Sequence, residues 1–144
     1  MEKIRIKYHS YIDRLEKTEK GDWIDLRVGE STLIVGYGYK AVPLGVSMEL
    51  PKGYEAIIAP RSSFYKNFGC LVVNSFGIID ESYCGDNDQW HLLVYNNSAM
   101  PVLLTKNTRI AQFRIIEHQP AIEFEEVETL GNENRGGIGS TGKE

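Results

Sequence analysis

The sequence has few cysteines, no long apolar run and no excess of positive charge, and each shortage excludes a class of protein. Its two cysteines make neither a metal-ligand spacing nor a disulfide framework, which indicates reduced thiols in a cytoplasmic protein. No apolar stretch approaches the length needed to cross a membrane, and the charged N-terminus lacks the pattern of a signal peptide. A formal net charge of −4 argues against nucleic acid as a partner, because backbone phosphates require a cationic surface.

What the sequence has in quantity is alternation of apolar and polar residues, the period of a half-buried strand. In IRIKY, for example, Ile4, Ile6 and Tyr8 fall on one face. Turn residues separate the segments, and only residues 61–68 are suited to a helical turn. A chain of 144 residues with this pattern is predicted to be one all-β domain, a sandwich, jelly roll or barrel. We expect strands at residues 4–8, 23–28, 32–34, 40–49, 54–60, 71–75, 90–95, 100–104, 108–117 and 121–127.

The C-terminal residues depart from this pattern. Four glycines lie between positions 136 and 142, and glycine has no side chain to bury and loses the most backbone entropy on ordering. The segment is therefore either a solvated end or an arm that orders over a ligand. Arg135, the amides between the glycines, and the hydroxyls of Ser140 and Thr141 are all donors suited to phosphate.

Two polar clusters in the first half of the chain have both a structural and a chemical interpretation. In GDWIDL, Asp22 and Asp25 order a turn before a strand, or Asp25 faces a hydrated metal. In APRSSFYKNFG, Arg61, Ser62 and Ser63 begin the expected helical turn. A guanidinium, two hydroxyls and backbone amides at one spot suit phosphate oxygens, although serine is also an ordinary N-cap.

Two further clusters follow in the second half. In NSFGIIDESYCGDND, Asp80 is either a turn former or a general base, since an aspartate is ionised at neutral pH. Tyr83 lies three residues later, where its ring either packs in the core or approaches the same pocket. In RIAQF, strict alternation predicts that Arg109 and Gln112 point to opposite faces of a strand.

In this order the stretches GDWIDL, APRSS, NSFGIIDESYCGD, RIAQF and RGGIGSTG resemble the five motifs of the homotrimeric dUTPase family. PRSS, GDND and the compact tail are most similar to the phage-type enzymes of Gram-positive bacteria. The resemblance implies a distorted all-β jelly roll over residues 1–130, with a flexible C-terminal arm at residues 131–144. It also implies Mg²⁺-dependent hydrolysis of dUTP to dUMP and pyrophosphate by a homotrimer, in which each arm closes a neighbouring subunit's active site.

The resemblance also implies roles for individual residues. Asp80 would deprotonate the attacking water, and the Tyr83 ring would lie under the deoxyribose. Asp25 would lie near the hydrated metal without binding it directly. Substrate contacts are implied for Arg61, Ser62, Ser63, Asn74, Gly77, Ile78, Ile79, Gln112, Arg135, Gly136, Gly137, Ile138, Gly139, Ser140 and Thr141.

The chain departs from the family pattern in its arm. The aromatic residue that usually stacks over the uracil is replaced by Ile138, so either the stacking is lost or another ring acts as the lid. Trp90 and His91 follow the GDND turn, and alternation allows only one of them to face the site. Ser63 and Asp86 stand where glycine and glutamate are more usual, which we interpret as subtype variation.

Two other functions compete with hydrolysis of dUTP. A dCTP deaminase shares the fold and an IDLR-like stretch, but it needs a carboxylate in the strand after the GIID hairpin, and WHLLVYNN contains none. The other is a regulatory protein on the same scaffold, for instance one that binds a repressor if the chain is phage-encoded. The presence of Asp80, Tyr83, Arg61 and the arm favours an active enzyme, and it leaves room for a second, regulatory role.

Overall fold

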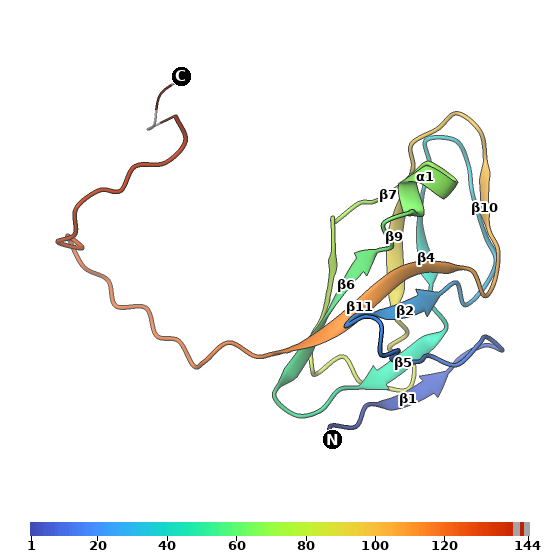
Figure 1. Cartoon of the computed structure of the whole chain (residues 1–144), viewed down its shortest axis with the longest axis horizontal. Coiled ribbons are helices and arrows are strands. Elements are labelled where there is room, and N and C mark those ends of the chain that lie inside the picture. Colours follow the sequence, from blue (N-terminus) through green and yellow to red (C-terminus); the bar gives the residue numbers. More distant parts are fainter. Residues whose placement is uncertain (140–141, 143–144) are drawn as a thin grey trace.

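The computed structural model describes residues 1–139 and 142, and it consists almost entirely of short strands. Figure 1 shows a β body from which a long C-terminal segment extends away. The elements are β1 (Arg5–Tyr8), β2 (Ile24–Arg27), β3 (Thr32–Ile34), β4 (Tyr39–Pro43), β5 (Val46–Glu49), β6 (Tyr54–Pro60), α1 (Phe64–Phe68), β7 (Cys70–Val72), β8 (Gly77–Ile79), β9 (His91–Asn96), β10 (Val102–Leu104) and β11 (Arg109–Glu117). The predicted all-β architecture is confirmed. No helix in the described part of the chain is long and apolar enough to cross a membrane.

All the strands pair antiparallel, in two larger sheets and two strand pairs. One sheet has the order β2-β11-β6-β8 and the other β4-β9-β7, while β1 pairs with β5 and β3 with β10. Trp90 and Phe113 meet edge-to-face in the core, with ring centroids 5.2 Å apart. Each buried aromatic or aliphatic side chain of this kind contributes about 1.5–3 kcal/mol relative to exposure. Packing in the core therefore fixes the positions of the strands next to which the polar clusters of the sequence lie.

The strand expected over residues 40–49 is interrupted, because the chain changes sheets at Gly45. β4 belongs to the three-stranded sheet and β5 pairs with β1. Gly45 has φ +74°, and a Cβ there would lie 2.8 Å from the Ser10 hydroxyl oxygen. Glycine is the residue that adopts this conformation without strain. A glycine inside an apolar run was the sequence signal for the break.

The strand expected over residues 121–127 is absent, so that prediction is wrong for the single chain. The amide of His118 donates to the Gly53 carbonyl (2.9 Å), and every described residue after it is exposed. Ile122 and Phe124 alternate as in a strand but are 56% and 95% exposed. A strand requires a partner edge, and the described part of the chain offers none to this segment.

The short helix α1 and the two cysteines follow the prediction more closely. α1 lies within the expected residues 61–68 and ends at Gly69, whose φ of +63° closes the last turn with a bond to the Tyr65 carbonyl. Cys70 is buried and Cys84 exposed, and both are free thiols.

Candidate active site

A cavity of about 400 Å³ lies beside β8 and the turn that follows it. We call it the β8 cavity. Because β8 is the last strand of its sheet, alternate residues direct their N–H and C=O groups away from β6 and toward the outside. The wall of the cavity is thus partly bare backbone. Its lining contains the sequence-predicted residues Asn74, Gly77, Ile78, Ile79, Asp80, Tyr83, Trp90 and His91.

Asp80 begins the turn that closes the β8 cavity. Its carbonyl accepts the Tyr83 amide (3.0 Å), and its Oδ1 accepts the amide (2.8 Å) and the hydroxyl (2.5 Å) of Ser82. The Ser82 hydroxyl, and then the Ser82 amide, lower the pKa of the Asp80 carboxyl, since both donate to its charged form. Asp80 is therefore a turn former, as one of the two interpretations of the sequence expected, and its carboxylate is exposed; a role as general base stays a prediction.

Tyr83 and His91 are held against the cavity by one shared acceptor. The Tyr83 hydroxyl donates to the Gln89 carbonyl (3.1 Å), and His91 Nδ1 lies 2.8 Å from the same oxygen. Because a carbonyl only accepts, this contact places the proton of His91 on Nδ1. Both side chains are exposed, Tyr83 by 39%. One backbone oxygen thus orients two rings at the cavity wall.

Trp90 cannot be the lid, which corrects one of the two lid hypotheses. Its side chain is fully buried and packs edge-on against Phe113. The ring faces the core because Trp90 precedes β9, in which alternate side chains point inward. His91 therefore stays as the one lid candidate of this pair.

A second group of residues from the predicted motifs lies on β2, on β11 and directly after β6, and the lining of the β8 cavity contains none of these residues. Asp25 Oδ1 lies 3.2 Å from Arg61 Nε, and Asp25 Oδ2 lies 3.5 Å from a terminal nitrogen of Arg109. The Gln112 amide donates to the Pro60 carbonyl (3.2 Å). We call Asp25, Arg61 and Arg109 the arginine cluster. All three side chains are partly exposed, so an incoming anion can reach the two guanidinium groups.

Arg109 joins this cluster because β11 contains a bulge. Gln112 pairs with Asp25, but the register then shifts, and Arg109 pairs with Arg27. Directly paired residues project from the same face of a sheet. Arg109 and Gln112 therefore share a face, and the prediction of opposite faces is wrong because one extra residue reverses the alternation. The sequence signal was two consecutive buried residues, Ile110 and Ala111, inside the strand.

Ser62 and Ser63 lie between the arginine cluster and α1. Ser62 is exposed, and Ser63 is the N-cap of α1 without a side-chain hydrogen bond to the helix. The structural role of a capping serine is thus not fulfilled by the Ser63 hydroxyl. It stays available for another acceptor.

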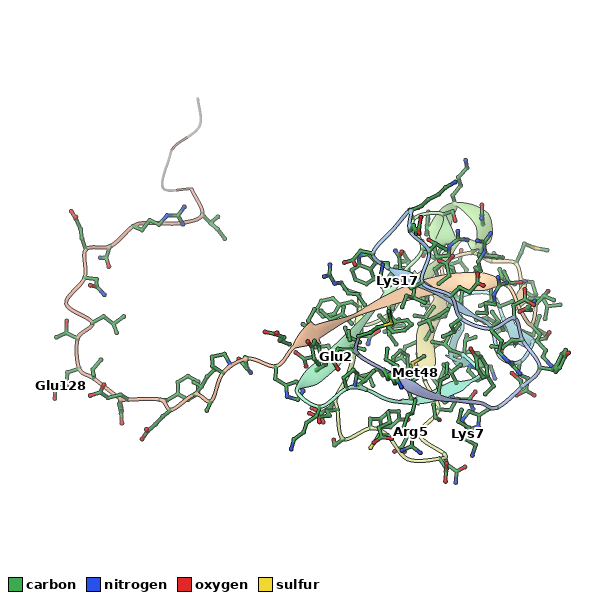
Figure 2. The ribbon with its side chains drawn as sticks, turned by 60° about the horizontal axis from the view of Figure 1, so that its bottom comes forward. Glu2, Arg5, Lys7, Lys17, Met48 and Glu128 are labelled. Carbon is green, nitrogen blue, oxygen red and sulfur yellow. The ribbon has the colours of Figure 1, made fainter. Side chains whose placement is uncertain are left out.

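The described residues of the arm lie away from both groups of residues within one chain. Figure 2 shows Glu128 on the extended segment, well outside the body that carries Lys17 and Met48. The predicted arm residues from Arg135 to Gly139 are all exposed, and Ile138 is 110% exposed. Ser140 and Thr141 lie outside the described residues.

The comparisons with known proteins agree on one family. The family model for dUTPase matches residues 14–142. An SPbeta prophage-derived deoxyuridine 5'-triphosphate nucleotidohydrolase of Bacillus subtilis, YosS, is 53% identical over 140 residues, which cover 96% of this chain and 97% of that protein. The chain belongs to the dUTPase family.

Solved dUTPase structures share the fold. The Staphylococcus bacteriophage 80alpha dUTPase with dUPNHPP superposes with a TM-score of 0.81 at 17% identity, covering 98% of this chain and 99% of that chain. A mutant dUTPase from phage phi11 of S. aureus, described with a structural Mg(II) ion, gives 0.76 at 15% identity over 89% and 98%. These similarities confirm the predicted dUTPase-like jelly roll.

Proposed function

We propose that this member of the dUTPase family hydrolyses dUTP to dUMP and pyrophosphate in the β8 cavity. The observation that carries the proposal is an exposed ionised carboxylate, Asp80, beside a cavity walled by the open backbone edge of β8. A nucleobase can pair with such an edge, and a carboxylate at its end can accept a proton from water. The family match over residues 14–142 supports this chemistry.

The open edge of β8 is the element that would select uracil. Alternate N–H and C=O groups of Gly77, Ile78 and Ile79 suit the O2, N3 and O4 edge of the base. Cytosine presents an amino donor where uracil has an acceptor, and such a mismatch leaves a buried donor unpaired at a cost of about 1–3 kcal/mol. Tyr83, held by its hydroxyl to Gln89, would pack against C2′ and leave no room for a ribose hydroxyl.

In this proposal, the arginine cluster and its neighbours bind the phosphates of the substrate. Arg61, Arg109 and the hydroxyls of Ser62 and Ser63 supply charge and donors of the kind that phosphate oxygens require. Asp80 would take the proton from the water that attacks the α-phosphorus in line with the departing pyrophosphate. Phosphoryl transfer needs mainly positioning and neutralisation of charge, which accounts for many donors around a single base.

The residues fit a magnesium ion held by the substrate rather than by the protein. No group of three or more His, Cys, Asp or Glu side chains among the described residues could hold a metal. Asp25 has an arginine against each carboxylate oxygen, so its role toward a cation would be indirect, through water. When bound to the triphosphate, Mg²⁺ would spread the phosphate charge and stabilise one geometry.

A homotrimer with shared sites is the assembly that we propose. Tyr39, Leu71, Val73 and Tyr95 line an apolar hollow on the β4-β9-β7 sheet, and Tyr39, Leu71 and Val73 are 53%, 45% and 57% exposed. Exposed apolar patches of this kind mark protein interfaces. The described residues of the arm, 131–139 and 142, are all exposed in their own chain, so a neighbour's site is the natural place for Arg135 and the glycines that follow it.

His91 would cover the base in place of the missing arm aromatic. Its ring is exposed, lines the β8 cavity and is oriented by the Gln89 carbonyl. Ile138 would add only an aliphatic contact. A planar ring stacks on a base with a specific geometry that an aliphatic side chain does not offer.

The test is a panel of deoxyribonucleoside and ribonucleoside triphosphates with Mg²⁺, scored for pyrophosphate release. We expect release from dUTP and little from dCTP, dTTP or UTP, and no release by Asp80→Asn. Ammonia release from dCTP would instead support the deaminase. A repressor partner stays a prediction that a binding assay, separate from turnover, would test.

A further inference from the structure

The turn after β8 gives the two oxygens of Asp80 different surroundings. Oδ1 accepts both the amide (2.8 Å) and the hydroxyl (2.5 Å) of Ser82. No described residue forms a hydrogen bond or ion pair with Oδ2. The carboxylate is exposed and lines the β8 cavity. One oxygen is thus occupied by the turn, and the other is open to solvent.

This division matters because a carboxylate at the end of a short side chain rotates broadly. The χ2 torsion of aspartate is nearly two-fold and poorly confined, whereas a general base must hold one oxygen within about 3 Å of the proton that it accepts. Two donors on the same oxygen confine that torsion. The Ser82 amide restrains the position of Asp80 Oδ1, and the Ser82 hydroxyl restrains the same oxygen from a second direction.

We propose that Ser82 is a positioning residue for the hydrolysis of dUTP, whose amide and hydroxyl hold Oδ1 of Asp80 so that Oδ2 faces the attacking water. This rests on the proposed function, in which Asp80 is the base. The Ser82 side chain also lines the β8 cavity, but its hydroxyl is engaged by Asp80 Oδ1. It acts through Asp80 alone.

The charges around Asp80 are consistent with this role. His118, at the end of β11, also lowers the pKa of the Asp80 carboxyl, but by less than Ser82 does. Glu81 faces His118 (3.6 Å) and accepts the Gly53 amide (3.2 Å), so its carboxylate is engaged away from Asp80. Donors to the charged form keep Asp80 ionised at lower pH. Loss of the Ser82 hydroxyl therefore raises the pH at which the base becomes protonated.

The chain contains the same turn a second time, with a different outcome. Asn96 Oδ1 accepts the amide (3.1 Å) and hydroxyl (2.8 Å) of Ser98. The other amide atom of Asn96 is fully used, since Nδ2 donates to the carbonyls of Ile34, Val35 and Met100. Asn96 is buried, and its turn is purely structural. Ser98→Ala is therefore a matched control for the loss of a turn hydroxyl.

The experiment measures kcat and KM for dUTP against pH, by pyrophosphate release, for the full chain and for Ser82→Ala, Ser82→Thr and Ser98→Ala. For Ser82→Ala we expect kcat to fall on the order of tenfold, as a misplaced reacting group predicts. KM should stay unchanged, and the acid limb of the kcat/KM profile should move to higher pH. Ser82→Thr should restore both, and Ser98→Ala should alter neither.

A wild-type kcat and an unshifted acid limb in Ser82→Ala would overturn the proposal. If Ser82→Ala does not fold, which thermal unfolding would reveal, NMR titration of the Asp80 carboxyl in the wild-type protein decides. A pKa at or above the ordinary aspartate value there also overturns it. Wild-type turnover by Asp80→Asn would instead contradict the proposed function, so the two failures are distinguishable.

Discussion

The β8 cavity and the arginine cluster satisfy their polar groups in opposite ways. In the β8 cavity, one carbonyl, that of Gln89, orients both the Tyr83 hydroxyl and the His91 ring, and the outer edge of β8 pairs with no other strand in the described part of the chain. In the arginine cluster, the two guanidinium groups are already paired with one carboxylate, Asp25. The first region is preorganised by neutral backbone groups. The second holds its charges by mutual attraction, so binding of an anion, as proposed, would require these ion pairs to rearrange.

The comparison implies different tasks for the two regions. Neutral groups in fixed positions discriminate shapes and hydrogen-bond patterns, because an unmatched donor remains unpaired. Charged groups in partly exposed positions provide affinity for any anion and discriminate little. We therefore expect substitutions in the β8 cavity to affect turnover and selectivity, and substitutions in the arginine cluster to affect the affinity for the triphosphate.

The largest effect should come from Asp80→Asn, which removes the base and keeps the shape of the turn. Loss of a general base typically lowers kcat by roughly 10²–10⁴-fold. In Asp80→Asn, the amide and hydroxyl of Ser82 can still donate to the new side-chain oxygen at position 80, so the variant should fold. Steady-state kinetics and calorimetric titration with a non-hydrolysable dUTP analogue would check this. A large loss of binding along with turnover would show that Asp80 holds the substrate instead.

Removal of residues 131–144 should produce the next largest effect. The described residues of this segment are exposed and pack on no part of their own chain, so stability should be unchanged. The phosphate donors and the exclusion of water would be lost, and loss of such donors lowers kcat by about 10²–10³-fold. Turnover assays and light scattering would measure activity and assembly. Dissociation of the oligomer on truncation would contradict an arm that acts only at the site.

A smaller effect is expected from Arg109→Ala, which opens the arginine cluster. A hydrogen bond to a charged group contributes about 1.5–3 kcal/mol, so KM for dUTP should rise by about tenfold or more. The inhibition constant of deoxyuridine, which has no phosphate, should not change. Arg5→Ala is the control, because Arg5 is an exposed arginine that also pairs with a carboxylate, Glu49. Equal effects of both variants on KM would refute a specific role for Arg109.

The smallest effect should follow from His91→Ala. Aromatic stacking contributes about 0.5–1.5 kcal/mol beyond burial, which corresponds to a several-fold rise in the KM for dUTP and in the inhibition constant of deoxyuridine. Trp90→Phe should lower the melting temperature and leave KM unchanged, because Trp90 is a core residue. If His91→Ala has the kinetics of the wild type, the base is covered by another residue.

The order of the motifs in the sequence was enough to predict the fold class and many of the residues that line the β8 cavity, although Ser82 and Gln89 were missed. Local patterns bring Asn74, Asp80 and Tyr83 together because they lie in the turns immediately before and after one short strand, β8. The sequence did not reveal that Arg109 faces Asp25, since a bulge is a property of two paired strands. The failed strand at residues 121–127 has the same cause. Alternation describes one chain's own residues, but a strand exists only with a partner.

The β11 bulge has a consequence for how this protein tolerates genetic change. A substitution of Ile110 by another aliphatic residue leaves the count of residues between Arg109 and Gln112 intact. Deletion of that single residue would leave Arg109, Ala111 and Gln112 opposite Arg27, Leu26 and Asp25 in regular alternation, so Arg109 would stay on the face of Asp25 without a bulge. The deletion would instead remove the fully buried Ile110 side chain from the core. Selection on this stretch therefore maintains the packing that the extra residue provides, whereas the face on which Arg109 lies does not depend on that residue.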